Sequence, residues 1–265
     1  MEKEINAIYV EENADLEKAK KISKKFNIKI ITDNKETSGL TLYLGKRGLS
    51  LVYDNLKLSG DFSKMIKRLK QNNLQNEILI HAAKIKEKTR DLIAIDATAG
   101  MGEDSMLLAA YGYNVSLYEN NPIIAELLKD SLERAKQLPE LKEITSRMHI
   151  YEEDSIIAMP KLQKNPDIIL LDPMFPERTK SSLIKKKFQV LHKIENPCEN
   201  EVELLNSAIK ANPKKIIIKR PLKGDYLAGI KPDYSLKGNS IRYDCIINIS
   251  RFNKTNYRGK KNDRD

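Results

Sequence analysis

The chain begins with short apolar segments separated by longer polar ones. Residues 5–10 and 28–32 are apolar and of strand length, and they flank a lysine-rich segment, 15–26, for which we expect a helix. Residues 39–44 and 49–53 alternate apolar and polar positions across a glycine-containing turn, which is typical of a β-hairpin. This pattern predicts a small N-terminal α/β appendage.

We place the end of the appendage at residue 75, and its function stays open between RNA docking and a structural cap. Residues 61–90 are basic, and apolar side chains recur there at helical spacing at Phe62, Met65, Ile66 and Leu69. A helix with a solvated lysine face is the commoner explanation of such a segment. Contact with RNA phosphates is the alternative, because the segment leads directly into the next motif.

Strands and helices alternate from residue 92 onward. The expected strands are 92–95, 114–118, a third before residue 154, 167–171, 214–219 and 242–251, and the expected helices include 105–111 and 122–136, with a linker near Pro139. This order predicts an α/β fold, a doubly wound Rossmann-like sheet over residues 76–252. The basic tail, 253–265, has little apolar content and is expected to be disordered.

A turn rich in small residues follows the first of these strands, with the sequence DATAGMGED from Asp96 to Asp104, and we expect Asp96, Gly100 and Gly102 to be among the cofactor-binding residues. Gly100 and Gly102 let the backbone approach a ligand closely, and the following helix presents free amides at its N-terminus. Glu119 ends the next strand, where a carboxylate is placed to accept both hydroxyls of a ribose.

The turn does not fit a dinucleotide fingerprint, because Ser105 occupies the position of the third glycine. The pattern instead suits S-adenosylmethionine, which has no phosphate to bind. Asp154 and Ser155 follow the third strand, where an acid can accept the adenine amine. A helix N-cap before Ile156 explains the same two residues at least as well, and both interpretations can hold together.

The fourth parallel strand ends in the sequence LDPMFP, residues 171–176. Asp172 supplies a carboxylate acceptor, Pro173 fixes φ, and the backbone carbonyls around Pro173 and Met174 can accept from an amine. Phe175 offers a flat face on which a base can stack. An ordinary Asp-Pro turn is the alternative. The glycine turn reaches the same edge of the sheet, which favours a site for a planar base beside a methyl donor.

Basic residues crowd the segment after this loop. The candidates for RNA phosphate contacts there are Arg178, Lys180, Lys185 and Lys186, with Lys219 and Arg220 at the end of a later strand. A solvated lysine face and surface charge at a strand end are the alternatives. The formal net charge of +10 favours a polyanionic partner, most simply nucleic acid.

Composition argues against several classes of protein and site. Hydrophobic residues make up 40% of the 265 positions and charged residues 32%, which is typical of a globular protein without membrane spans. Two cysteines without CxxC spacing and three histidines disfavour a zinc site or a disulfide framework, so we expect no metal. The N-terminus lacks the pattern of a signal peptide, and we therefore expect a cytoplasmic location and no membrane partner.

Four motifs in this order resemble the ribosomal RNA small subunit methyltransferase J family. They are DATAGMGED (96–104), YENNP (118–122), LDPMFPERTKSSLIKKK (171–187) and KRP (219–221), and the weaker KGxxxRYD (237–244) follows them. The similarity extends over about residues 76–247 and is looser before them. The LDPMFP segment is highly specific, whereas many methyltransferases share the glycine turn.

The resemblance implies methyl transfer from S-adenosylmethionine to the exocyclic N2 of a guanine in 16S rRNA, position 1516, in naked rRNA or in the 30S subunit. Carried over by motif, it implies donor contacts at Glu103, Asp104, Glu119, Asn120, Asp154, Ser155 and Asp172. The family usually has arginine where Glu103 and Asn120 stand, and a glycine-rich basic stretch where this chain has residues 70–76.

Three other functions stay open on the sequence. An amino-methyltransferase of another RNA or DNA base would use the same fold and loop. A nicotinamide oxidoreductase is disfavoured by Ser105, and a non-catalytic RNA-binding protein is disfavoured by the intact loop at Asp172. The oligomeric state is not predicted.

Overall fold

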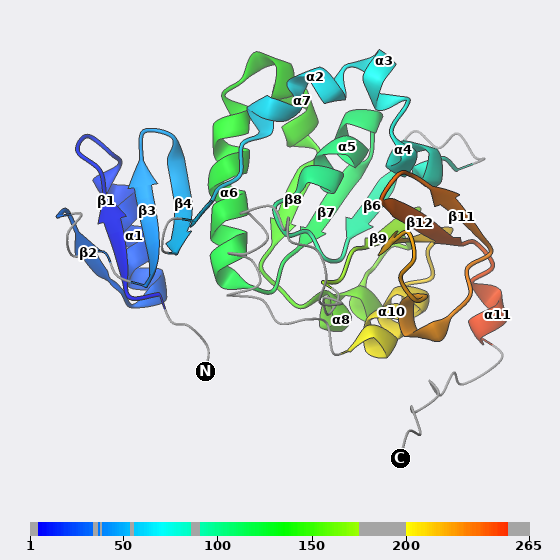
Figure 1. Cartoon of the computed structure of the whole chain (residues 1–265). Helices are drawn as coiled ribbons and strands as arrows, with labels where there is room; N and C mark the ends of the chain where they lie inside the picture. The colour runs from blue at the N-terminus through cyan, green and yellow to red at the C-terminus, as the bar shows by residue number, and fades with distance from the viewer. Residues whose placement is uncertain are drawn as a thin grey trace.

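A computed structural model of the chain describes residues 5–33, 37, 39–53, 56–85, 91–174 and 200–253. The polypeptide forms two sheets, and helix α6 (Pro122–Lys136) stands between them (Figure 1). Of the residues described, none form a helix that is long and apolar enough to cross a membrane.

The N-terminal sheet has the strand order β2-β1-β3-β4-β5. Its elements are β1 (Ala7–Val10), α1 (Leu16–Phe26), β2 (Lys29–Ile31), β3 (Leu40–Gly45), β4 (Gly48–Tyr53) and β5 (Leu56–Leu58). The predicted hairpin is confirmed, since β3 and β4 are antiparallel and Gly45 pairs with Gly48. Asp15 begins α1 as expected, because its carboxylate accepts from the N–H of Lys18 at 2.9 Å.

The basic segment after this sheet forms four short helices rather than one. They are η2 (Phe62–Met65), α2 (Ile66–Leu69), α3 (Gln71–Leu74) and α4 (Ile78–Ala83). Phe62, Met65 and Leu69 are buried in the same cluster as Leu107 of α5 (Glu103–Tyr111). The apolar residues at helical spacing therefore anchor this segment to the larger sheet.

The larger sheet has the strand order β11-β12-β10-β9-β6-β7-β8. Its strands are β6 (Ile93–Asp96), β7 (Asn114–Tyr118), β8 (Met148–Tyr151), β9 (Ile168–Leu171), β10 (Lys215–Pro221), β11 (Tyr234–Lys237) and β12 (Ile241–Ile246). The five strands from β10 to β8 are parallel, and β12 and β11 add an antiparallel edge. This is the predicted doubly wound sheet, and the strand order reverses between β6 and β9.

Two expectations in this region were wrong, and one strand was missed. The predicted linker near Pro139 is helix α7 (Pro139–Ser146), because a proline fits the first turn of a helix. The last strand ends at Ile246 instead of Arg251, and helix α11 (Ser250–Asn253) follows it. Strand β11 was not expected at all.

The two faces of the larger sheet are covered differently. Helix α5 packs with Leu117 and Ile217 on one face, and α10 (Glu201–Lys210) packs with Ile216 and Ile218 on the other. The segments α8 (Ser155–Ala158), η3 (Met159–Lys161) and η4 (Leu227–Gly229) pack close to α10. Buried residues of β6, β9 and β10 form the centre of the core, as expected for parallel strands.

Helix α6 joins the two sheets through a buried carboxylate. Asp130 Oδ1 lies 2.8 Å from Nζ of Lys18, and Asp130 Oδ2 accepts from the N–H of Leu49 at 2.9 Å and from Nε of Arg134 at 2.9 Å. Ile124 and Leu127 of the same helix pack in the apolar cluster of the N-terminal sheet. The two sheets are thus held together by apolar packing and by a buried charge with three donors.

We expect Asp130→Ala to lower the free energy of unfolding by about 3 kcal/mol, because the change removes a buried acceptor that two cations and a buried N–H share. Urea denaturation measures this. Glu133→Ala is the matched control: Glu133 also pairs with Lys18 at 2.8 Å, but its side chain is 65% exposed against 2% for Asp130. The control should cost less than about 1 kcal/mol. Equal losses in the two variants would contradict this account of the interface.

Candidate functional site

The carboxyl ends of β6, β7, β9 and β10 meet at one edge of the larger sheet, and the predicted site residues gather there. The turn between β6 and α5 contains two glycines with positive φ, 51° at Gly100 and 74° at Gly102. A Cβ on Gly102 would lie 2.7 Å from Cδ1 of Leu128. A Cβ on Gly100 would meet no described atom within 4 Å. The positive φ favours glycine at both positions. A Cβ would also crowd Leu128 at Gly102, whereas no described atom crowds Gly100.

Asp96 shapes this turn from inside the protein. Its buried carboxylate accepts from Oγ of Ser105 at 2.5 Å and from the N–H of Thr98 at 3.2 Å. Burial raises the pKa of Asp96 to about 7, against the opposing hydrogen bond from Ser105. These contacts hold the first turn of α5 against the end of β6, so we assign Asp96 to the frame of the site rather than to its surface.

Glu119 connects the turn to the next strand. Its carboxylate accepts from the N–H of Gly100 at 2.9 Å and from the N–H of Asn121 at 2.8 Å. Burial raises the pKa of Glu119, and hydrogen bonds from backbone amides oppose the rise. Because a carboxylate has about four lone-pair directions, Glu119 can still accept from a ligand beside Gly100.

The other predicted donor contacts lie at the ends of neighbouring elements. Asp154 caps α8, since its carboxylate accepts from the N–H of Ile156 at 2.8 Å, and Ser155 is buried behind it. The predicted N-cap is therefore confirmed, and a contact between Asp154 and adenine stays a prediction. Glu103 and Asn120 are exposed on the same edge.

Asp172 is the next residue along the chain after β9, and it is held at two points. Its backbone N–H donates to Oγ1 of Thr98 at 2.6 Å, which ties the loop after β9 to the glycine turn. Its Oδ2 lies 2.9 Å from Nζ of Lys219, which in turn lies 2.8 Å from Oδ2 of Asp104. The Asp172 side chain is 36% exposed, so a ligand can reach its carboxylate. Pro173 is buried and Met174 half-buried beside it.

Lys219 and Arg220 differ from the sequence interpretation, which treated both as cations free to contact phosphate. Lys219 is bound by two carboxylates. The side chain of Arg220 is 6% exposed and lies 3.0 Å from Glu201 of α10. Consecutive residues of a strand point to opposite faces, so one side chain faces α5 and the other faces α10. We therefore no longer assign a phosphate contact to Arg220.

Several predicted site residues lie outside the described part of the chain. They are Phe175, Arg178, Lys180, Lys185 and Lys186, together with the basic tail. Their roles in base stacking and RNA contact stay predictions.

Sequence reasoning missed two members of the site. Thr98 lies within the glycine turn, but nothing in its residue type indicated a bond to the loop after β9. The sequence indicates only a positive charge at Lys219. Its contact with Asp172 depends on the pairing of β9 with β10, which the sequence does not show. Within the described ranges, no group of three or more His, Cys, Asp and Glu side chains is arranged to hold a metal ion.

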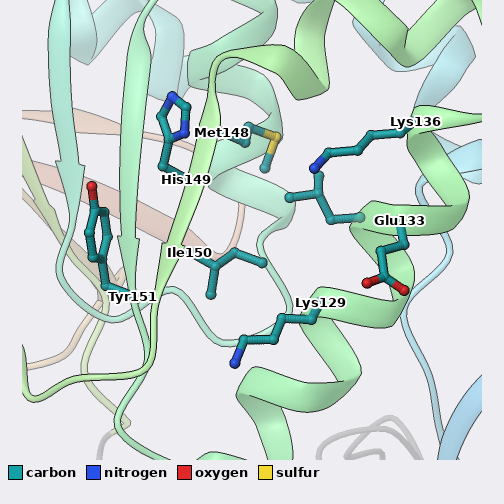
Figure 2. Close-up of a pocket in the computed structure, with 8 residues that line it drawn as sticks. Lys129, Glu133, Lys136, Met148, His149, Ile150 and Tyr151 are labelled. Atoms are coloured by element: carbon teal, nitrogen blue, oxygen red, sulfur yellow. The ribbon is translucent and has the colours of Figure 1, made fainter. Parts of the chain in front are cut away.

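A second hollow lies away from this edge, between α6 and the outer strand β8. Figure 2 shows Lys129, Glu133 and Lys136 of α6 facing Met148 and Ile150 of β8 across it. Its volume is about 420 Å³, and its lining includes none of the predicted site residues. The sheet edge beside Gly100 and Asp172 remains the candidate site.

Residues 21–248 match the protein family described as "Putative SAM-dependent methyltransferase". Relatives named ribosomal RNA small subunit methyltransferase J include a protein of Nitrosococcus oceani, 36% identical over 214 residues, 78% of this chain and 84% of that protein. The protein of that name from Thioalkalivibrio sulfidiphilus is 33% identical over 240 residues, 87% of this chain and 93% of the relative.

A solved structure, that of a SAM-dependent methyltransferase from Neisseria gonorrhoeae, is also similar to the chain. It is 27% identical, has a TM-score of 0.69, and is matched over 91% of this chain and 96% of its own. The expected class of fold is thereby confirmed, and a nicotinamide oxidoreductase is removed from the alternatives. The chain belongs to the ribosomal RNA small subunit methyltransferase J family, and its cofactor is S-adenosylmethionine.

Proposed function

We propose that the protein methylates the exocyclic N2 of a guanine in 16S rRNA, the position numbered 1516 by family resemblance. The observation that carries the proposal is the reachable carboxylate of Asp172, fixed beside the glycine turn by Thr98 and Lys219. Relatives 33–36% identical are named as methyltransferases of small subunit ribosomal RNA, which supports RNA as the substrate.

The residues at the sheet edge fit the methyl donor. No described atom lies within 4 Å of a Cβ built on Gly100. Glu119 keeps acceptor capacity for the ribose hydroxyls, and Asp154 can accept from the adenine amine. These acceptors suit a ligand whose nucleoside part offers hydroxyl and amine donors. When bound, S-adenosylmethionine supplies a methyl group already activated by its sulfonium.

The chain's own task is to present the amine nitrogen. The lone pair of a guanine amine is spread into the ring, and acceptors that hold its two hydrogens favour a nitrogen able to attack. As the nitrogen–carbon bond forms, the bond from the methyl carbon to sulfur breaks, and the nitrogen loses one of its protons after the transfer. Asp172 supplies one acceptor, and the backbone carbonyls near Pro173 can supply another. Positioning of this kind removes much of the barrier without a metal or a covalent intermediate. A guanine in a helical region must also be extruded, at a cost of a few kcal/mol.

The N-terminal sheet offers a surface for docking RNA. On the face away from α1, the rings of Tyr9 and Tyr43 stack with centroids 5.0 Å apart, and Nζ of Lys57 lies 4.4 Å from the centroid of Tyr43. Aromatic rings and ammonium groups together are typical of surfaces that bind single-stranded nucleic acid. We therefore include RNA docking by this sheet in the proposal.

Asp172→Asn tests the catalytic part of the proposal. The variant keeps the shape of the side chain and loses its charge, so we expect methyl transfer to fall by about 100-fold or more, by analogy with other groups that stabilise a transition state. Tritiated methyl transfer to rRNA from a strain that lacks the enzyme measures this. Asp91→Asn, at an exposed acid, is the control. Equal incorporation by Asp172→Asn and the wild type would remove Asp172 from the mechanism and favour a non-catalytic role.

Glu119→Gln tests the donor site. Loss of a charged acceptor should weaken S-adenosylmethionine binding by roughly 10- to 100-fold, because hydrogen bonds to charged groups contribute about 1.5–3 kcal/mol. Calorimetry measures the dissociation constant, and a thermal melt checks that the variant is folded. Glu140→Gln, at an exposed acid of α7, should bind as the wild type does. Unchanged affinity in Glu119→Gln would show that this carboxylate does not contact the donor.

Lys57→Glu tests RNA docking. Reversal of one charge on the open face should raise the KM for rRNA several-fold and reduce its dependence on salt, while kcat stays unchanged. Lys21→Glu makes the same change at an exposed lysine of α1, on the covered side of the sheet. If both variants, or neither, raise KM, the open face is not the docking surface.

A further inference from the structure

Strand pairing brings Asp172 and Lys219 together. Strands β9 and β10 are parallel, and Leu171 pairs with Ile218 as the last pair between them. The next residue of each strand is therefore Asp172 on one and Lys219 on the other. The two side chains leave the carboxyl edge of the sheet next to each other.

Lys219 joins three elements around its ammonium group. Besides Asp172, it binds Asp104 in the first turn of α5, and it stands opposite Tyr243 of β12. Its side chain is 25% exposed. Burial lowers the pKa of Lys219, but the carboxylates of Asp172 and Asp104 more than offset that effect and raise it. The ammonium group therefore keeps its charge across the neutral range.

Among the described residues, the charged and titratable groups around Asp172 come from four elements. The facing groups are Lys219 and Arg220 of β10, Asp104 of α5, Asp96 of β6 and Tyr243 of β12. Burial raises the pKa of Asp172 and Asp104 adds to the rise, while the ammonium of Lys219 opposes it. Lys219 is thus the nearest of these groups that favours the ionised carboxylate.

We propose that Lys219 is a positioning residue, whose ammonium group orients the Asp172 carboxylate toward the substrate and keeps it ionised. This inference rests on the proposed function, in which Asp172 accepts from the amine that is methylated. An ionised carboxylate has only acceptors, whereas a protonated one turns an O–H donor toward the amine. Lys219 also connects Asp172 to Asp104 in the first turn of α5, directly after the glycine turn. The loop after β9 and the glycine turn are therefore linked through the same ammonium group.

Lys219→Met and Lys219→Arg separate charge from packing. Without the ammonium group, the pKa of Asp172 should rise, because an opposite charge at this distance typically lowers a carboxyl pKa by about 1–3 units. In a plot of kcat against pH, the acid limb is the range in which kcat rises as Asp172 loses its proton. In Lys219→Met this limb should move to higher pH by about one unit or more. We expect kcat near pH 7 to fall by about 100-fold, through misorientation as well as protonation. Lys219→Arg should leave the acid limb in place.

A structural role alone gives a different result. In that case Lys219→Met would lower kcat equally at all pH values and leave the acid limb where it is, which would overturn the proposal. Wild-type kcat in Lys219→Met would overturn it as well. If Lys219→Met does not fold, Asp104→Asn provides the second test. Removal of that like charge leaves Asp172, among the described residues, as the one carboxylate bound to Lys219, which should lower the pKa of Asp172 and move the acid limb to lower pH. An acid limb that stays in place or moves upward would contradict the proposal.

The proposed function can fail separately from this inference. If the wild-type protein transfers no methyl group to guanine N2, the proposed function is wrong, whatever the pH profiles of the Lys219 variants are. If the wild type does methylate N2 and the acid limb of Lys219→Met does not move, only the role of Lys219 is wrong.

Discussion

The pairing of β9 with β10 places a lysine and an aspartate side by side at the carboxyl edge of the sheet, and the site depends on that contact. Lys219 lies within 2.9 Å of Asp172 and 2.8 Å of Asp104, so it connects the loop after β9 to the first turn of α5. Thr98 adds a second connection through the N–H of Asp172. The proposed acceptor for the amine and the proposed binding turn for the methyl donor are therefore joined by direct contacts.

Family membership gives this unit its chemistry. The methyl donor is already activated, so what the protein must supply is orientation, and orientation needs side chains that are themselves held. Asp96 with Ser105 and Glu119 with the N–H of Gly100 hold the turn. A held side chain also joins the two sheets, because Asp130 of α6 accepts from Lys18 of α1, from Leu49 of β4 and from Arg134 of its own helix. These contacts fix the N-terminal sheet relative to the larger sheet.

Local patterns predicted most of the elements and the edge at which the site forms. Alternation identified the β3–β4 hairpin, and the order of strands and helices identified the parallel sheet. Because parallel strands bring their carboxyl ends to one edge, Glu119 and Asp172 could be placed together from the sequence. Pro139 was misinterpreted because proline interrupts helices but also begins them.

Contacts that depend on register between distant strands could not be predicted in this way. Lys219 and Arg220 are adjacent and carry the same charge. Because consecutive side chains of a strand lie on opposite faces, Lys219 contacts Asp172 and Arg220 contacts Glu201. The bond of Thr98 to Asp172 and the role of Asp130 likewise need the assembled fold.

The most direct measurement is the chemical identity of the product. Small subunit RNA from a strain lacking the enzyme is methylated by the purified protein, digested to nucleosides and analysed by mass spectrometry against standards. The account predicts N2-methylguanosine, because the carboxylate of Asp172 is positioned to accept from an exocyclic amine. A methyl group on a ring nitrogen of guanine or on a ribose oxygen would contradict it.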